Sequence, residues 1–388
     1  MVVSTSCILD VNRAVYRHLS SFLNVNLHLV IPIRSKEAVA HGGLSKTESE
    51  PFQVTMLKMS GPHNRLERAA GLRDIIESWR PSHLLLEFDP ATLIVWDVVQ
   101  ASRHQNLSIS VIALENQPRN FILESFQALK RFQLRIAVGG LIASWFLRSV
   151  QGKIQHVFTV CDDGTTVMTE FGFAGRITKI PLGFDASIFC QQDQNKISLT
   201  RQRLNLRCTT IAYFGRLIPE KGVDLLIEAL STLRDMPWQF LIDTFSTYKS
   251  PYEVELHSQI QELKLMDRIV YFDASHNEMP DYMNAADIVV LPSISTPKFK
   301  EQYGRVIAEA MACGKIVIGS KSGAIPELIG DAGFLVAEGD VSRLSEILRY
   351  LLTASQGELD SIRTKAYKRA HLYFSAARQA DVIFSKLN

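Results

Sequence analysis

The sequence predicts an α/β protein built from two doubly wound domains, each with a parallel sheet covered by helices on both faces. The chain has 388 residues, which exceeds one ordinary domain and suits two of about 150–200 residues each. Short apolar, β-branched runs alternate with longer helical patterns from end to end. Many of these runs are apolar throughout, as in strands that are buried on both faces of a parallel sheet.

Seven such runs stand in the first half of the chain and six in the second, so each domain is expected to hold a sheet of six or seven strands. The runs of the first half are SCILDV, NLHLVIPI, FQVTMLK, HLLLEF, SISVIALE, HVFTVC and RITKIPLG, and those of the second half are TTIAYFG, QFLIDTF, IVYFDA, IVVLPS, KIVIGS and GFLVAE.

The pattern is lost after IPLGFD, where the chain turns polar. We therefore expect an N-terminal Rossmann-like domain at residues 1–185, a linker at 186–207 and a C-terminal Rossmann-like domain at 208–369. The last helical pattern has no strand after it, so residues at about 370–388 are expected to pack back on the first domain. Ligands of parallel sheets bind beyond the carboxyl ends of the strands, and two such domains facing each other would share a cleft.

The composition is that of a globular enzyme, with 46% hydrophobic and 21% charged residues. A net charge of +2 gives no basis for a nucleic-acid partner, which needs a concentrated basic face. The five cysteines form no CxxC pair, which argues against a disulfide framework or a zinc site and favours a reducing cytoplasm. The first residues lack the basic region of a secretory signal, and no uncharged apolar stretch approaches the ~20 residues of a membrane span.

Two cations follow a strand in the stretch YFGRLIPEKGVDLLIEAL. Arg216 and Lys221 lie between that strand and a helix, where a pyrophosphate would be neutralised by a planar fork and a compact charge. The start of the helix adds free N–H groups and positive potential. The alternative is an ordinary strand–turn–helix with solvated charges.

Two carboxylates, Glu301 and Glu309, are separated by seven residues in EQYGRVIAEAMACGKIVIGSKSGAIPEL. Glu301 is expected in a loop and Glu309 in the next helix, at a span that suits opposite ends of one extended ligand. Gly304 and Arg305 place backbone N–H groups at the helix start, which suits a phosphate. The neighbours of Glu309 are apolar, so a partner or ligand is expected; the alternative is an exposed glutamate on an amphipathic helix.

These two motifs resemble those of family 4 glycosyltransferases, the large retaining family with the GT-B fold (group 1 type). The first resembles the family's GR-x-x-x-EKG loop, and the second its E-x7-E signature followed by EAMACG and a Ser/Gly-rich turn ending in PE. IPLGFD resembles the segment at which the family's chain crosses between domains. The likeness is specific over about residues 180–336 and weak before them.

The resemblance implies transfer of a sugar from a nucleoside-diphosphate sugar with retention of configuration. No metal and no other cofactor is expected, because two cations neutralise the diphosphate. Arg216 and Lys221 would bind the diphosphate and stabilise it as leaving group, Glu309 would bind the ribose and Glu301 the donor sugar. The other implied donor contacts are the backbone of Gly304, Arg305 and Val306, Asp273 and Ala274 near the nucleobase, and the hydroxyl of Thr244 near the phosphates.

The first domain departs from the family pattern on the acceptor side. The usual Gly-rich loop is replaced by ILDVNRAVYRHL, where Arg13 is a candidate for contacting the acceptor and Asn12 either for the same side or for a helix cap. The usual histidine at the end of a mid-domain strand is replaced in VIALENQPRN by Glu115 and Asn116. These two residues are expected either to position an acceptor hydroxyl, with Glu115 in a catalytic role, or to form a turn before Pro118.

The stretch 119–153 carries six basic residues against one acidic residue, Glu124, around apolar runs that contain Trp145 and Phe146. A basic, aromatic-bearing amphipathic helix suits the surface of an anionic membrane. We therefore expect a cytoplasmic protein that can lie peripherally on the inner membrane face. The alternative is a helix pair packed inside the domain.

The favoured hypothesis is an active glycosyltransferase whose acceptor is a polysaccharide, a lipid or a small molecule. The alternative is a non-catalytic GT-B subunit that binds a nucleotide sugar or a partner protein. The four donor-site charges argue against this alternative, and the altered first domain leaves it open. A sugar epimerase would need a different acid/base set, and a phosphorylase a pyridoxal-binding lysine with longer flanks. The nucleotide (UDP, GDP or ADP), the sugar, the acceptor and the oligomeric state stay open.

Overall fold

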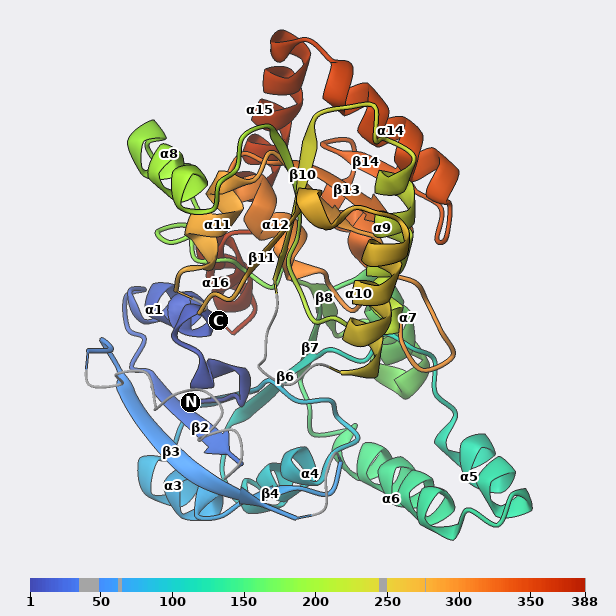
Figure 1. Cartoon of the computed structure of the whole chain (residues 1–388). Coiled ribbons are helices and arrows are strands. Elements are labelled where there is room, and N and C mark those ends of the chain that lie inside the picture. Colours follow the sequence, from blue (N-terminus) through green and yellow to red (C-terminus); the bar gives the residue numbers. More distant parts are fainter. Residues whose placement is uncertain (35–48, 62–64, 244–249, 276, 388) are drawn as a thin grey trace. The chain divides into compact units, whose positions relative to one another are not determined.

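The chain divides into two compact units in the computed structural model, which describes residues 1–34, 49–61, 65–243, 250–275 and 277–387 (Figure 1). Unit 1 comprises Met1–Pro181 and Gln379–Asn388, and unit 2 comprises Leu182–Arg378. The division falls at Pro181 rather than at the expected Asp185. The reason lies in Phe184, which forms an isolated bridge with Ser375 and receives a backbone hydrogen bond from Ala376, both within unit 2.

The segment 186–207, expected as a linker, is not extended chain. It holds helix α8 (Gln194–Arg203), which begins where the side chain of Asp193 accepts a hydrogen bond from the backbone of Lys196. Arg201 of this helix donates to the carbonyl oxygen of Ala285 at 2.7 Å. The sequence of this segment is polar because α8 is largely exposed to solvent, with Thr200 as its one buried residue.

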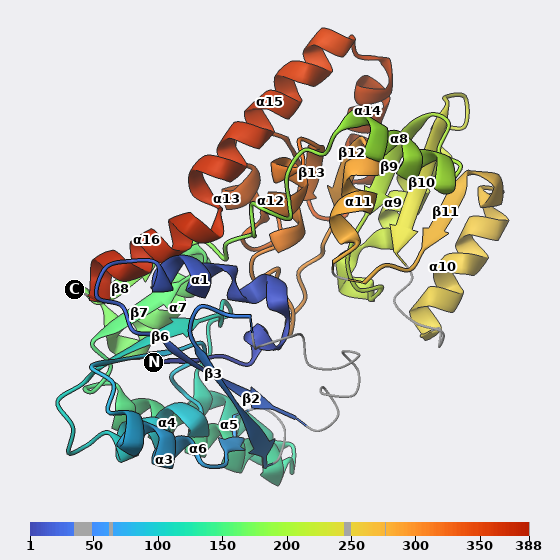
Figure 2. The ribbon, with the colours of Figure 1, turned by 90° about the vertical axis from the view of Figure 1, so that its left-hand side faces the viewer.

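Unit 2 contains a parallel sheet of six strands in the order β11-β10-β9-β12-β13-β14. Each strand falls in one of the predicted runs, except that β10 begins one residue before its run, at Trp238. Helices cover both faces of the sheet (Figure 2). This is the order of a doubly wound domain, which reverses direction between its first and fourth strands, here β9 and β12. The strands are β9 (Thr209–Tyr213), β10 (Trp238–Asp243), β11 (Ile269–Phe272), β12 (Ile288–Leu291), β13 (Ile316–Ser320) and β14 (Phe334–Val336). The further helices are α9 (Val223–Ser231), α10 (Pro251–Glu262), α11 (Met279–Ala285), α12 (Arg305–Ala312), α13 (Ile325–Ile329), α14 (Val341–Thr353) and α15 (Gln356–Tyr373), and the chain ends in α16 (Ala376–Leu387).

Unit 1 contains a sheet of eight described strands in the order β4-β3-β2-β1-β5-β6-β7-β8. All neighbours are parallel except β3 and β4, and the order reverses between β1 and β5. The strands are β1 (Val2–Val3), β2 (His28–Ile33), β3 (Gln53–Ser60), β4 (Arg68–Ala69), β5 (His83–Leu86), β6 (Ser108–Ala113), β7 (His156–Thr159) and β8 (Ile177–Lys179). The helices are α1 (Ala14–Ser20), α3 (Leu72–Trp79), α4 (Leu93–Ala101), α5 (Phe121–Lys130), α6 (Leu134–Val150) and α7 (Asp162–Met168).

The expectation of a first strand in SCILDV is wrong. The first strand is Val2–Val3, and SCILDV forms the 3-10 turns η1 (Ser6–Ile8) and η2 (Asp10–Arg13). Cys7 and Val11 are buried there, and their spacing of four residues is helical. A short run with four apolar residues among six positions does not distinguish this spacing from the alternation of a strand.

Helices α5 and α6 form a hairpin at one side of unit 1 (Figure 1). A Cβ at Gly140 would lie 2.8 Å from the carbonyl oxygen of Phe121, so the close approach of the two helices depends on this glycine. Ala137, Ala143 and Phe146 are buried, which agrees in part with a helix pair packed into the domain. Many other apolar side chains of the hairpin are nevertheless exposed. None of the helices in the described residues is both long enough and apolar enough to cross a membrane.

Candidate functional site

The loops after β9 and β12 flank the point where the sheet of unit 2 reverses its order, which is where such sheets bind ligands. The loop after β9 passes through the turn η4 (Pro219–Lys221) to Gly222. A Cβ at Gly222 would lie 2.3 Å from the carbonyl oxygen of Pro292, and its φ is +65°. Glycine is therefore required here on both counts. The backbone of Ile294 also donates to Glu220 at 2.8 Å, which joins the two loops.

This close approach brings together Lys221 and Glu301, which are 80 residues apart in the sequence. Lys221 Nζ lies 2.6 Å from Glu301 Oε2, and only 12% and 9% of the two side chains are exposed. Ser293 Oγ donates to the same carboxylate oxygen at 2.9 Å, and the ammonium group lies 5.4 Å from the centroid of the Phe299 ring. The lysine and the first glutamate of the two motifs thus form one buried ion pair.

Arg216 lies on the same loop with an exposed side chain. Its carbonyl oxygen accepts a hydrogen bond of 2.7 Å from the hydroxyl of Tyr213. Burial, with the charge of Glu301, raises the pKa of Tyr213 well above its ordinary value, so this hydroxyl stays protonated as a donor. The backbone at Arg216 is therefore held in place while its guanidinium group is open to a ligand.

The turn after β13 closes on the backbone of Glu301. A Cβ at Gly323 would lie 1.9 Å from the carbonyl oxygen of Glu301, and φ is +51° at this glycine. The neighbouring N–H of Ala324 donates to the same oxygen at 3.1 Å. The Ser/Gly-rich turn of the second motif therefore has a structural task, which is to position Glu301.

Gly304 stands directly before helix α12, at its N-cap, in a left-handed conformation with φ of +77°. Glu309 inside the helix is 8% exposed, so the alternative of an exposed glutamate is wrong. Its partner is Arg305, one turn earlier, with Nε 3.0 Å from Oε1. Burial raises the pKa of Glu309 and the Arg305 charge opposes this. Val306 is half-buried beside them.

A further carboxylate, which the sequence did not single out, lies at the end of β10. Asp243 is fully buried and is in register with Phe272, so the next residue on the neighbouring strand is Asp273. Burial, and secondly the charge of Asp273, raise the pKa of Asp243 to about 7. Asp273 is exposed and Ala274 half-buried, while Thr244 lies outside the described residues.

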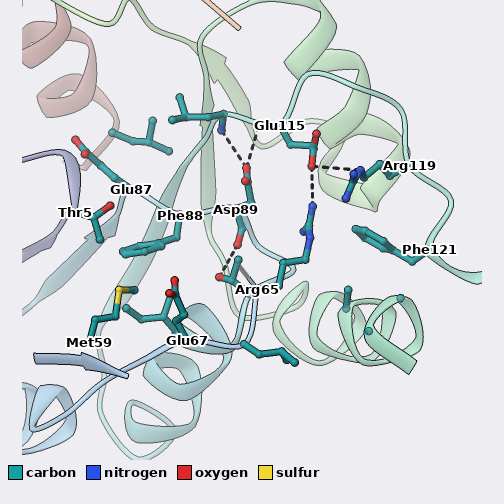
Figure 3. A pocket seen from close by; sticks show the side chains of 18 of the residues that line it. Thr5, Met59, Arg65, Glu67, Glu87, Phe88, Asp89, Glu115, Arg119 and Phe121 are labelled. Atoms are coloured by element: carbon teal, nitrogen blue, oxygen red, sulfur yellow. Dashed lines mark hydrogen bonds and ion pairs between the residues drawn. The ribbon is translucent and has the colours of Figure 1, made fainter. Parts of the chain in front are cut away.

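Unit 1 has its own cavity, of about 780 Å³, beyond the ends of β1, β5 and β6 (Figure 3). Glu115 lies in it with Oε2 2.7 Å from Arg65 NH2 and 3.8 Å from Arg119 Nε. Asp89 fixes the backbone just after β6, because its carboxylate accepts hydrogen bonds from the backbone N–H groups of Leu114 and Glu115 at 3.0 Å each. Burial and the charge of Asp89 raise the pKa of Glu115, and the two arginines oppose this.

The predicted acceptor-side residues divide into two groups. Glu115 lines the cavity, whereas Asn116 is buried. Arg13 is fully buried, with Nε 2.8 Å from the carbonyl oxygen of Cys7 and NH1 3.3 Å from Glu50, so its interactions are internal and its predicted contact with an acceptor is wrong. Asn12 does not cap α1, which begins after Arg13 without a side-chain cap; it donates to the carbonyl of Ser6 at 2.6 Å.

The chemistry of the unit 2 edge suits an anionic, hydroxyl-bearing ligand. Arg216, Lys221 and the N-terminus of α12 attract a phosphate, and the carboxylates of Glu301 and Glu309 accept hydrogen bonds from hydroxyl groups. Within the described ranges, no group of three or more His, Cys, Asp or Glu side chains is placed to hold a metal ion.

Residues 198–369 match the model of the family described as glycosyl transferases group 1. Over 191 residues the chain is 35% identical to the GDP-mannose-dependent monoacylated alpha-(1-6)-phosphatidylinositol monomannoside mannosyltransferase of Corynebacterium glutamicum, covering 47% of this chain and 49% of that protein. Over 176 residues it is 30% identical to the lipopolysaccharide 1,2-N-acetylglucosaminetransferase of Salmonella typhimurium, covering 42% and 44% of the two. The chain thus spans about half the length of these relatives.

The crystal structure of Anabaena Alr3699/HepE in complex with UDP resembles this chain with a TM-score of 0.74 at 20% identity, over 100% of this chain and 98% of that one. At this identity the likeness concerns the fold, and it confirms the predicted GT-B class with its two parallel-sheet units. The family match covers the segment of unit 2 that carries Arg216, Lys221, Glu301 and Glu309. Over residues 198–369 the chain is therefore similar to the glycosyl transferases group 1 family.

Proposed function

We propose that the chain moves a sugar from a nucleoside-diphosphate sugar to a hydroxyl group of an acceptor, with retention of anomeric configuration and without a metal ion or other cofactor. The observation that carries this proposal is the buried Lys221–Glu301 pair, which lies beside the exposed Arg216 at the strand-order reversal of unit 2. Cations and carboxylates together match the charged and the hydroxylated parts of such a donor.

Each group has a role in this reaction. Arg216 and Lys221 bind the diphosphate and neutralise the charge that grows on it as the bond to the sugar breaks. Glu301 shares Lys221 with the diphosphate and accepts a hydrogen bond from the donor sugar, and Glu309 accepts from the ribose. The backbone N–H groups at 304–306 add to the phosphate site.

The nucleobase lies beside Asp273 and Ala274 in this proposal. Two known proteins guide the choice of nucleotide: the Corynebacterium relative is named as GDP-mannose-dependent, and the Anabaena protein was crystallised with UDP. GDP and UDP sugars are therefore the donors to test first.

The acceptor side of the proposal rests on Glu115 in the cavity of unit 1. Because its pKa is raised, this carboxyl group can exchange a proton with an acceptor hydroxyl more readily than an ordinary glutamate. Arg65 and Arg119 hold it in place through the ion pairs at 2.7 and 3.8 Å.

We also propose that residues 119–153 contact an anionic membrane and that the protein is cytoplasmic. Lys130, the last residue of α5, and Arg131, which follows it, are exposed next to exposed apolar side chains. The five cysteines are all free, as expected in a reducing compartment. Flotation with anionic vesicles tests the contact, and unchanged binding of a Lys130→Ala/Arg131→Ala variant would contradict it.

The central experiment measures melting temperatures of the full chain with UDP, GDP and ADP sugars. A bound donor at 100 times its Kd stabilises the folded state by about 2.7 kcal/mol. Arg216→Ala is the sharpest variant, because the side chain is exposed and its removal should leave stability unchanged while binding is lost. Glu309→Gln is the second, and Arg343→Ala, exposed on α14, is the matched control.

Stabilisation by one nucleotide family that Arg216→Ala and Glu309→Gln abolish supports the proposal. No stabilisation by any donor contradicts it. Hydrolysis of the stabilising donor then separates an enzyme from a non-catalytic subunit, which would bind without turnover. Proton NMR of the first sugar released tests retention, since an α-linked donor should yield the α-anomer first.

A further inference from the structure

Unit 2 has a polar cavity of about 520 Å³ at the amino ends of its strands, and every residue that lines it belongs to this unit. Asp287 and Lys315 line the cavity, and each stands directly before a strand, β12 and β13 respectively. The loops of the proposed donor site follow the carboxyl ends of β9 and β12 instead. The length of β12 or β13, about 13–17 Å at 3.3 Å per residue, therefore separates the cavity from the donor site.

Four segments that are distant in the sequence form the walls of this cavity. They are α8 with the residues before it, the end of α11, the turn after α12 and the first two turns of α15. Helix α8 packs against α11, and α12 packs against α15. The volume lies in the range of sites for small molecules.

The lining carries one positive charge in excess. Three cations, Arg201, Lys315 and Arg363, stand against two carboxylates, Asp287 and Asp360. Asp287 lies between the two arginines, with its oxygens 3.3 Å from Arg201 NH1 and 3.7 Å from Arg363 NH2. Asp360 lies 3.0 Å from Arg363 NH1. Both carboxylates are thus paired with arginines.

Lys315 is the cation that remains without an ion pair. Its Nζ donates to the carbonyl oxygen of Asn284 at 2.7 Å, and no carboxylate in the part of the chain that the structure describes lies within 4 Å of it. The side chain is half-buried, and an ammonium group has three N–H donors. Two of its donors are therefore available to an anion that enters the cavity.

The pKa of Lys315 agrees with this geometry. Burial lowers the pKa from 10.5 to about 8; Asp287 and Cys313 oppose this shift, whereas Arg363 and Arg201 add to it. An anion bound beside the ammonium group would raise the pKa again. Occupation of the cavity is therefore coupled to the uptake of a proton.

The rest of the lining is rich in side-chain amides. The amide residues are Asn284, Gln191, Gln192, Gln194 and Gln356. Amides both donate and accept hydrogen bonds, as the hydroxyl groups of a sugar do. A ligand with one anionic group and several hydroxyl groups matches such a lining.

We propose that this cavity is a second ligand site of unit 2, which binds a phosphorylated sugar with its phosphate beside Lys315, Arg201 and Arg363 and its hydroxyl groups against the amides and Asp360. The site is separate from the donor site. The inference goes beyond the proposed function and does not depend on it.

Isothermal titration of the full chain at about pH 8 and constant ionic strength tests this with three probes. Glucose 6-phosphate carries the anion and the hydroxyl groups, sulfate the anion alone, and glucose the hydroxyl groups alone. Glucose 6-phosphate is expected to bind about ten-fold more tightly than either of the others, since each loses charged or polar hydrogen bonds. Equal affinity for sulfate would overturn the assignment to a phosphorylated sugar, and absence of glucose 6-phosphate binding would overturn the site.

Variants of unit 2 locate the binding. Arg363→Gln should weaken glucose 6-phosphate about ten-fold, because it removes one charged donor. Lys365→Gln removes a cation from the same helix outside the cavity and should change nothing. Lys315→Met is the second cavity variant if Arg363→Gln lowers the melting temperature. Arg216→Ala should leave the affinity unchanged; loss there, with Arg363→Gln and Lys315→Met intact, would place the ligand in the donor site and overturn the proposal.

Proton uptake identifies the contact with Lys315. Sulfate does not titrate in this range, so its binding near pH 8 should take up as much as about half a proton, supplied to the ammonium group. The uptake is the dependence of the titration heat on the ionisation enthalpy of the buffer, and it should vanish near pH 6.5, where Lys315 is already protonated. Binding near pH 8 without uptake would contradict the contact.

Nucleotide-sugar binding by the same samples tests the proposed function separately. Stabilisation by a nucleotide sugar is expected to persist in Arg363→Gln and to disappear in Arg216→Ala. Absence of this stabilisation with glucose 6-phosphate binding intact contradicts the proposed function alone, and the reverse result contradicts this inference alone.

Discussion

The buried carboxylate of Asp243 provides the sharpest test of the electrostatics in unit 2. The side chain is fully buried, and neither of its oxygens has a hydrogen-bond partner in the part of the chain that the structure describes. Its pKa is raised from 3.8 to about 7, first by burial and then by Asp273. We expect Asp243→Asn to abolish a pH dependence of stability that the wild type shows.

The sign follows from proton binding in the two states. Between about pH 4 and pH 7 the folded chain keeps a proton that the unfolded chain has lost, so the free energy of unfolding falls as the pH rises. Each pKa unit corresponds to about 1.36 kcal/mol of unfolding free energy. The interval from pH 5 to the pKa of about 7 therefore lowers the free energy of unfolding by about 2–3 kcal/mol. The advantage of the Asn variant over wild type should grow by this amount between about pH 5 and pH 8.

Urea unfolding followed by the fluorescence of Trp238 measures this difference, because Trp238 is buried in the same strand. A background with the other three tryptophans, all in unit 1, replaced by Phe isolates its signal. The relevant result is how the difference in free energy of unfolding between the variant and the wild type changes with pH. The difference at a single pH also contains the cost of burying the amide, which does not depend on pH. Asp267→Asn, at an exposed aspartate, is the control. An Asn advantage that is the same at both pH values would refute the reasoning.

Three further predictions concern the ion pair, the turn and the hairpin. Lys221→Met should lower the free energy of unfolding by about 3 kcal/mol, because it removes the positive charge that pairs with the buried carboxylate of Glu301. Lys221→Met/Glu301→Gln should recover most of this loss in urea unfolding, and equal losses in the single and double variants would argue against the pair. Gly339→Ala should lower the free energy of unfolding by about 1–2 kcal/mol, because only the left-handed backbone opposes a Cβ there and no atom lies within 4 Å of it. Gly323→Ala should lower it clearly more, because its Cβ would also lie 1.9 Å from the carbonyl oxygen of Glu301. Phe132→Asp should weaken binding to anionic vesicles without lowering the melting temperature, since the ring is 91% exposed; a lower melting temperature would show that the ring packs in the domain.

The periodicity of the sequence was sufficient for the sheet of unit 2. All six of its strands overlap runs that are mostly apolar, because a parallel strand covered on both faces favours apolar residues. The same reasoning failed in SCILDV, where the buried Cys7 and Val11 belong to 3-10 turns. Periodicity also failed to predict helix α8 at residues 194–203, because a mostly exposed helix has the polar composition of a linker.

The sequence by itself determined that Arg216, Lys221 and Glu301 follow strands and that Glu309 lies in a helix. Each stands after an apolar run, or inside a helical pattern, that can be recognised in the sequence. Only the tertiary structure decided that Lys221 and Glu301 form a buried pair, since this contact depends on loops that close at Gly222 and Gly323. Only the structure, too, moved Arg13 into internal ion pairs and brought Arg65 to Glu115. Partners that are tens of residues apart are chosen by the strand order of the sheet, and no local pattern in the sequence records that order.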